Sequence, residues 1–247
     1  QTLLAADSAG SFLIELVARA DAIAQPRRSA GLYHVAIRLP SRAALARTVY
    51  RLVALGVRFQ GASDHQVSEA IYLADPDGNG LELYRDRPRS EWRMDDAQVT
   101  MGSDPLDTEA LLREGAHDDQ GWAGIDPATD IGHVHLHVSN LARAEAFYCD
   151  ALGFDVMQRN YPGALFVAAG GYHHHLGLNT WAGEGVPPAP ENAVGLRAIG
   201  VRIPDVGAWS ATLERLRAAG AAVTLDESGR TAHAMSNDDM RVELVHG

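Results

Sequence analysis

Three stretches of the chain repeat one pattern of hydrophobic and polar positions. Each begins with a short run of alternating apolar and polar residues, which is typical of a β-strand. Each continues with a segment whose apolar residues recur at helical spacing. The alternating runs begin at residues 31, 131 and 195. The spacing from each run to the glycine that follows its helical segment is nearly equal, which predicts an internal repeat.

The ends of the three helical segments support this interpretation. Helices are predicted at Ser41–Leu55, Asn140–Leu152 and Asp205–Ala219. Their first residues suit N-caps, because a short polar side chain can accept a hydrogen bond from the first helical turn. The glycines that follow, which suit the left-handed position past a helix end, are Gly56, Gly153 and Gly220.

Short β-like runs separated by turns follow each helix, so each repeat is predicted to be a βαβββ module. The predicted runs are Arg58–Gln60, Ala70–Ala74, Gly80–Tyr84, Asp155–Arg159, Ala164–Ala168, Tyr172–Asn179 and Arg241–Val245. The turn Asp75–Gly80 is rich in Asp, Pro, Gly and Asn, as β-turns are. The predicted fold class is therefore α+β, built from repeated modules.

The module boundaries follow from these elements. Residues 1–24 are predicted to hold the C-terminal strands of a partial first module, with Phe12–Val17 as its final strand. Residues 28–91 form the second module, 131–185 the third and 193–247 the fourth. Residues 92–130 are predicted to be an acidic linker that holds a short helix near Leu106–Arg113.

Composition narrows the classes of function and location. The net charge is −11, and the segment 92–130 carries ten acidic residues against two arginines. A nucleic-acid partner is not expected, because a duplex-binding surface needs a basic face. One cysteine rules out an intrachain disulfide and fits a reducing compartment. No apolar run nears the roughly 20 residues of a membrane span, and no signal peptide is visible. We therefore expect a cytoplasmic protein without a membrane partner, and, since the chain opens without Met, a missing N-terminal segment.

A longer motif gives the chain a resemblance to a known family. The run His65-Gln-Val-Ser-Glu-Ala-Ile-Tyr72-Leu-Ala-Asp75-Pro76-Asp-Gly78-Asn-Gly-Leu-Glu82 resembles the extradiol dioxygenase signature. The repeated βαβββ modules, with His on a first strand and Glu on a last strand, resemble the vicinal oxygen chelate superfamily. That superfamily includes glyoxalase I, fosfomycin and bleomycin resistance proteins and type I extradiol dioxygenases. The whole chain is most similar to the four-module catechol-2,3-dioxygenase-like branch, which implies curved, cup-shaped mixed sheets.

The resemblance implies a metal site. Two histidines and one carboxylate on one face leave open positions and suit non-haem Fe(II) oxygenases. His34 and Glu82 match the family's ligand positions, and His133 occupies the repeat position of His34. In the last module that position is Ala198. A triad of His34, Glu82 and His133 requires the second and third modules to pair. The alternative pairs modules one with two and three with four, with the third ligand in the missing N-terminal segment.

Other residues are candidates for the catalytic or substrate site. The resemblance implies that His65 and Tyr72 hydrogen-bond the substrate oxygens and move protons. The alternative is that His65 is a loop histidine and Tyr72 an aromatic residue of the core. His135 and His137 share the face of His133 by the two-residue period of a strand. The three residues that could line the substrate pocket are His174, His175 and Asn179, and the repeat register places His174 or His175 near the position of Glu82.

The resemblance favours a metal-dependent extradiol ring-cleaving dioxygenase acting on a catechol-like aromatic diol with O2. Fe(II) is the expected cofactor, with Mn(II), Zn(II) or Ni(II) as alternatives. Two other functions stay open: a glyoxalase-like metal-dependent isomerase or lyase, and a non-catalytic binding protein of the bleomycin-resistance type. The chain could form a homodimer.

Overall fold

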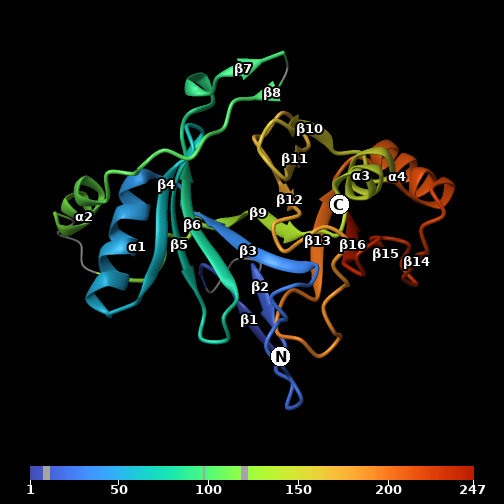
Figure 1. Cartoon of the computed structure of the whole chain (residues 1–247), viewed down its shortest axis with the longest axis horizontal. Coiled ribbons are helices and arrows are strands. Elements are labelled where there is room, and N and C mark those ends of the chain that lie inside the picture. Colours follow the sequence, from blue (N-terminus) through green and yellow to red (C-terminus); the bar gives the residue numbers. More distant parts are fainter. Residues whose placement is uncertain (8–11, 97, 118–121) are drawn as a thin grey trace. The chain divides into compact units, whose positions relative to one another are not determined.

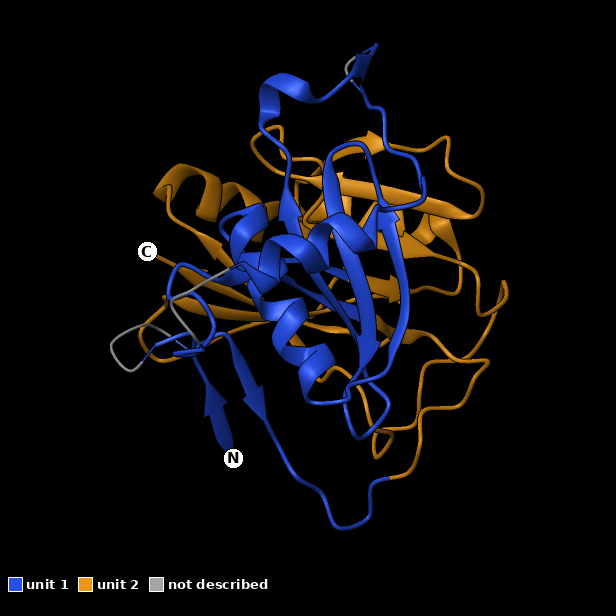
Figure 2. Cartoon of the chain, turned by 90° about the vertical axis from the view of Figure 1, so that its left-hand side faces the viewer, with its two compact units in different colours: residues 1–22, 34–134 blue, residues 23–33, 135–247 orange. Residues whose placement is uncertain are grey.

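The computed structural model describes residues 1–7, 12–96, 98–117 and 122–247 (Figure 1). These residues form two compact units, which Figure 2 shows in different colours. Unit 1 consists of Gln1–Ala22 and His34–Val134, and unit 2 consists of Ile23–Tyr33 and His135–Gly247. The strands β3 (Gly31–Arg38) and β9 (Asp130–His137) each contribute residues to both units.

Unit 1 contains one complete βαβββ arrangement. Besides its parts of β3 and β9, its elements are β1 (Thr2–Leu4), β2 (Ile14–Leu16), α1 (Arg42–Ala54), β4 (Phe59–Asp64), β5 (Ser68–Ala74), β6 (Gly80–Asp86), η1 (Arg89–Glu91), β7 (Met94–Asp95), β8 (Gln98–Val99) and α2 (Thr108–Ala116). The strand order of the module is β3-β6-β5-β4. β3 and β6 run parallel, whereas β6, β5 and β4 are antiparallel neighbours.

The two faces of this sheet have different roles. Side chains alternate between the faces along each strand. On one face, Ile71, Leu73 and Leu83 join Leu45 and Val49 of α1 in a buried core. Figure 1 shows α1 lying along β4, β5 and β6. The apolar residues of α1 therefore determine which face of the sheet the helix covers.

The opposite face carries the candidate chemistry. Ala36, Ala70 and Tyr84 form a small buried cluster on it, and Tyr72 packs against this cluster. Glu82 lies between Ala36 of β3 and Tyr72 of β5 in the strand register. Ala36, the small register partner of Glu82, leaves room on this face for larger polar side chains such as Glu82 itself.

The acidic segment 92–130 holds the predicted short helix, which the structure places at Thr108–Ala116 as α2. Leu111 of α2 is fully buried in the core that α1 shares with the sheet. The two helices approach closely at Gly115, where an added Cβ would lie 2.3 Å from the backbone oxygen of Ala46. The helix is therefore part of the unit 1 core.

Unit 2 contains two further groups of strands. Besides its parts of β3 and β9, its elements are α3 (Leu141–Glu145), η2 (Ala146–Ala151), β10 (Asp155–Gln158), β11 (Ala164–Ala168), β12 (Leu176–Asn179), β13 (Ala198–Ile203), α4 (Val206–Ala218), β14 (Val223–Leu225), β15 (Thr231–Met235) and β16 (Arg241–His246). β10, β11 and β12 are antiparallel neighbours. The last sheet has the order β13-β16-β15-β14, with β13 and β16 parallel.

The predicted helix ends are confirmed. Ser41, Asn140 and Asp205 are the N-caps of α1, α3 and α4, and each side chain accepts a hydrogen bond from a backbone N–H three residues later. The glycines beyond these helical segments all have positive φ angles: Gly56 at 72°, Gly153 at 95° and Gly220 at 77°. Only the helix after Asn140 departs from a regular helix, because η2 continues α3 as a π-helical turn.

One predicted strand begins later than expected. The run Tyr172–Asn179 is a strand only from Leu176. Gly170 and Gly171 both have positive φ angles, 63° and 66°, and form a turn that delays the strand. The histidines at 173–175 therefore precede β12 and do not lie on a strand.

The α+β fold class with mixed sheets is confirmed, because both units combine parallel and antiparallel strands with few helices. The assignment of residues to four modules stays a prediction. Among the described residues, no helix is long and apolar enough to cross a membrane.

Candidate metal centre

Unit 1 brings together the three residues predicted to bind a metal. Glu82 Oε2 lies 2.9 Å from His34 Nε2 and 3.1 Å from His133 Nε2. All three donor atoms lie within 4.8 Å of one another. The three residues are buried, with exposed fractions of 5% for His34, 2% for Glu82 and 3% for His133.

The local fold explains this convergence. β3 and β6 are parallel neighbours, so His34 and Glu82 project from adjacent strands. A turn that ends at Gly80 sets the start of β6; the Asp75 side chain accepts hydrogen bonds there from the backbone N–H groups of Asp77 and Asn79. His133 comes from β9, which reaches the site 51 residues later in the chain than Glu82.

The electrostatics of Glu82 favour a cation beside it. Burial raises the pKa of the Glu82 carboxyl group, but the charges and hydrogen bonds of His133 and His34 outweigh this effect and hold the pKa well below its usual range. The carboxylate is therefore ionised at neutral pH. An ionised carboxylate in a buried site needs a positive partner, which a metal ion or a protonated imidazole can supply.

The donor set fits a divalent metal ion. Two imidazole nitrogens and one carboxylate oxygen form the ligand set of non-haem iron oxygenases. Ligands about 2.1 Å from one ion and at right angles lie about 3.0 Å apart. The observed separations of 2.9 and 3.1 Å agree with this value.

His65 and Tyr72 form a hydrogen-bonded pair in the same unit. The Nδ1 atom of His65 lies 2.7 Å from the carbonyl oxygen of Gly102, and Nε2 lies 2.6 Å from the Tyr72 hydroxyl. Since a carbonyl oxygen only accepts, Nδ1 carries the hydrogen. In the neutral imidazole, Nε2 then accepts a hydrogen bond from the Tyr72 hydroxyl group.

This pair lies close to the three donors. The Tyr72 ring is 5.6 Å from the His34 ring between centroids, and Tyr72 is the register partner of Glu82. The structure thus brings five predicted site residues of unit 1 into one neighbourhood. Their roles as ligands and as proton-transfer groups stay predictions.

The other predicted site residues belong to unit 2. Asn179 is fully buried, and its side-chain oxygen accepts hydrogen bonds from His137 Nδ1 at 2.7 Å and from the Trp181 backbone N–H at 3.0 Å. His135 is buried beside the rings of Phe166 and Trp181. Whether these residues line a substrate pocket stays a prediction.

The adjacent histidines of unit 2 make contacts of their own. His173 and His174 are buried, with their Nδ1 atoms 2.7 Å apart, and the ring of His174 lies 5.0 Å from that of Phe166. His175 Nδ1 accepts a hydrogen bond from the backbone of Ala169. The substrate-pocket roles of His174 and His175 stay a prediction.

The expected register of these histidines needs correction. Glu82 pairs with Ala36, two residues after His34. The equivalent neighbour of His135, two residues after His133, is Gly177: an added Cβ at Gly177 would lie 2.7 Å from the His135 ring. Because β12 begins only at Leu176, Gly177 takes the position expected for His174 or His175.

Two residues beside the three candidate ligands were not predicted from the sequence. Tyr84 is fully buried, and its ring lies 4.9 Å from the His133 ring between centroids. An added Cβ at Gly132 would lie 1.7 Å from the Tyr84 hydroxyl oxygen. The two-residue period places Tyr84 on the face of Glu82, which is the sequence signal that could have found it.

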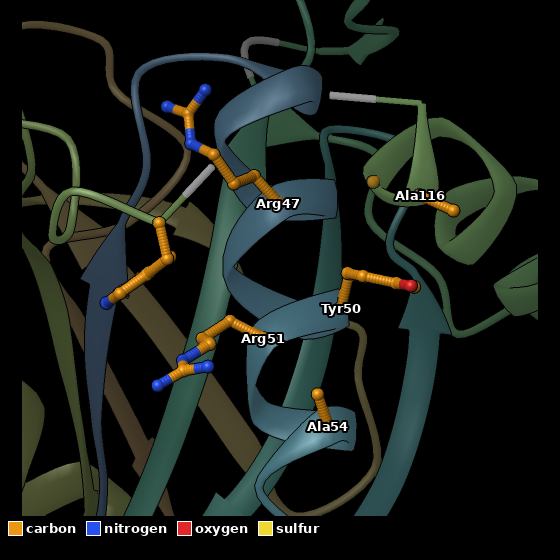
Figure 3. A pocket seen from close by; sticks show the side chains of 7 residues that line it. Arg47, Tyr50, Arg51, Ala54 and Ala116 are labelled. Carbon is orange, nitrogen blue, oxygen red and sulfur yellow. The ribbon is translucent and has the colours of Figure 1, made fainter. Parts of the chain in front are cut away.

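A cavity of about 200 Å³ lies elsewhere in unit 1, between α1, α2 and Trp122 (Figure 3). It is lined by Arg47, Tyr50, Arg51, Ala54, Gly115, Ala116 and Trp122. None of these is a predicted site residue. The candidate chemistry of the unit therefore rests on the buried donors of β3, β6 and β9.

Comparisons with known proteins place this arrangement in a family. The model of the Glyoxalase/Bleomycin resistance protein/Dioxygenase superfamily matches residues 4–83 and 130–245. A Bacillus subtilis (strain 168) protein named catechol-2,3-dioxygenase is 46% identical over 232 residues, which are 92% of this chain and 80% of that protein.

A crystal structure supports the fold. It is that of a provisionally assigned dioxygenase from Bacillus subtilis subsp. subtilis str. 168, with a TM-score of 0.60 and 14% identity. The match covers 87% of this chain and 62% of that one, so this chain spans less than two thirds of its length. At this identity the likeness concerns the fold alone. With the family model and the 46% identical relative, the chain belongs to the glyoxalase/bleomycin resistance protein/dioxygenase superfamily.

Proposed function

We propose that this chain is a metal-dependent extradiol dioxygenase that opens the ring of a catechol-like diol with O2. The observation that carries the proposal is the convergence of His34, Glu82 and His133 next to the hydrogen-bonded pair His65–Tyr72. The 46% identical relative named catechol-2,3-dioxygenase supports an enzyme of this class.

His34, Glu82 and His133 would hold the metal ion. We propose Fe(II), because two imidazoles and one carboxylate leave coordination positions open for a diol and for O2. Mn(II), Zn(II) and Ni(II) are the alternatives. When bound, the ion would bring the two substrates together at one point, so that their proximity favours the reaction.

The pair His65–Tyr72 would handle protons. Ring opening requires that a hydroxyl proton of the diol be removed and that a proton be returned later in the reaction. His65 presents its Nε2 atom to the Tyr72 hydroxyl group, and the hydrogen bond from Nδ1 to the Gly102 carbonyl oxygen fixes the orientation of the ring. Tyr72, between His65 and the metal ligands, can donate its hydroxyl proton or accept one.

The test is a reaction under controlled oxygen. The purified chain is loaded with Fe(II) without O2, mixed with catechol, and then exposed to O2. We expect one O2 consumed per catechol and a yellow ring-opened product. Glu243→Ala is the matched control, because Glu243 has the strand position of Glu82 in the last sheet. It should react like the wild type, whereas Glu82→Ala should not react.

A metal-loaded chain that consumes no O2 with any of a panel of catechols would refute the proposal. Metal-dependent isomerisation of a glyoxalase-type substrate in that chain would support the alternative class. The expected homodimer, the cytoplasmic location and the absence of nucleic-acid and membrane partners stay predictions.

A further inference from the structure

The third metal ligand comes from a different part of the chain than the other two. His34 and Glu82 are fixed by the pairing of β3 with β6, whereas His133 belongs to β9. The strand order places β9 beside β3 and not beside β6, so the orientation of the His133 ring also depends on side-chain contacts around β9. Two such contacts involve residues that have no assigned role.

The first contact is made by Tyr84 of β6. Its ring is fully buried and lies 4.9 Å from the His133 ring, at an angle of 53°. Gly132, the residue before His133, is buried against the same ring. A Cβ at this glycine would lie 1.7 Å from the hydroxyl oxygen and 2.7 Å from Cζ of Tyr84. The φ angle of Gly132 is not in the left-handed region, so glycine is required here for space alone.

The second contact is a charged one. Arg38 at the end of β3 donates two hydrogen bonds to Asp130 of β9, at 2.9 and 2.6 Å, and one to Asp86 of β6 at 3.1 Å. Such a two-point guanidinium–carboxylate pair restricts both distance and orientation. It anchors β9 two residues before Gly132.

We propose that Tyr84 and Gly132 are positioning residues for the metal centre, because they set the ring of His133 for coordination. The inference rests on the proposed metal function and adds residues to it. Any side chain at position 132 must displace the Tyr84 ring, and this ring is in contact with the His133 ring. The metal site should therefore weaken although all three ligands remain.

The experiment titrates the metal-free chain with Co(II) and records the visible absorption, which reports the coordination geometry. Gly132→Ala should weaken Co(II) binding roughly 10- to 100-fold, the scale of losses from residues that support metal ligands, and should change the spectrum. Gly200→Ala is the matched control on β13, because an added Cβ there meets nothing within 4 Å. It should bind Co(II) like the wild type.

A rescue variant separates positioning from general destabilisation. Tyr84→Phe keeps the ring and should bind Co(II) within a few-fold of the wild type. Added to Gly132→Ala, it removes the hydroxyl oxygen nearest the new methyl group and should restore part of the affinity and of the spectrum. A purely structural role would lower the melting temperature of Gly132→Ala without changing Co(II) affinity well below that temperature.

Three outcomes would overturn the inference. A folded Gly132→Ala chain with the wild-type Co(II) affinity and spectrum would show that Gly132 has no positioning role. Should that variant not fold, Tyr84→Leu replaces it, and wild-type Co(II) binding by Tyr84→Leu would remove the role of Tyr84. If the wild type itself binds no Co(II), the metal centre and the inference both fail.

Discussion

The strand pairs β3/β6 and β13/β16 have the same frame but different chemistry. Both pairs are parallel, and both place a glutamate opposite a small residue: Glu82 opposite Ala36, and Glu243 opposite Gly200. Two residues before these small residues, β3 carries His34 and β13 carries Ala198. The first pair forms a buried donor site. In the second, the Glu243 side chain is 44% exposed and lies 3.8 Å from His233.

A third case completes the comparison. Beside β9, the position equivalent to Glu82 is Gly177, and the ring of His135 occupies the space that a side chain there would need. The position equivalent to Glu82 beside β9 thus carries no carboxylate, and His133 is instead 3.1 Å from Glu82. The strand frame recurs, and one or two side chains decide whether it carries a cluster of donors such as His34, Glu82 and His133.

The strongest test of this comparison replaces Glu82 and Glu243 by alanine, one at a time. Glu82→Ala should lower metal affinity by more than about 100-fold, since a ligand is lost and not only a supporting residue. Glu243→Ala should leave metal content unchanged. Metal analysis after dialysis measures both. Stoichiometric metal in Glu82→Ala would show that Glu82 is not a ligand.

A second test separates ligands from proton-transfer groups. His65→Ala should keep its metal but lose roughly 10²- to 10⁴-fold in turnover of catechol, which is the usual effect of removing a general acid–base group. Parallel metal analysis and O2 uptake distinguish these effects. Unchanged turnover would assign His65 to the loop alone.

A gain of metal binding is expected when a histidine is introduced at position 198. Ala198→His would place an imidazole near Glu243 and His233. We expect a second Co(II) ion per chain, bound at least about tenfold more weakly than the first, because the exposed ligands are less fixed before binding. Titration by visible absorption counts the ions. A stoichiometry that stays at one would mean that the frame of β13/β16 cannot supply metal geometry.

The last test concerns the single cysteine, which lies in unit 2. Burial, together with the charges of Glu145 and Asp150, raises the pKa of Cys149 to about 12. At pH 8 only about one thiol in 10⁴ is ionised, against roughly a quarter for an ordinary thiol. Iodoacetamide should therefore react about a thousandfold more slowly with the folded chain than with the unfolded chain.

The same reaction serves as a control for the folding of unit 2 in the first test. Glu82→Ala should not change the alkylation rate of Cys149, measured by mass spectrometry. Rapid labelling of this variant would show that its loss of metal reflects unfolding and not the loss of a ligand.

Much of the local structure could be predicted from the sequence because it depends on neighbouring residues. The N-caps and the glycines past the helix ends act within one helical turn, so their pattern was sufficient. The start of the strand expected at Tyr172 was predicted wrongly, because two glycines with positive φ delay it.

Long-range contacts were harder to predict. His34, Glu82 and His133 were found from the repeat and from a family resemblance, and the structure brings them together. Tyr84 and Gly132 were not found, since their contact joins residues far apart in sequence and depends on an absent side chain. The burial of Leu111 was also missed, because the close approach at Gly115 cannot be seen in an acidic segment.

The wide separation of the three donors along the chain has a consequence for its synthesis. Glu82 and His133 are 51 residues apart, so a ribosome adding 5–20 residues per second makes β9 about 3–10 s after Glu82. During this interval the growing chain has the carboxylate and His34 but not the third donor. The unit also lacks Leu111 of its core for the first part of that time. Under the proposed function, tight metal uptake must therefore follow the emergence of β9.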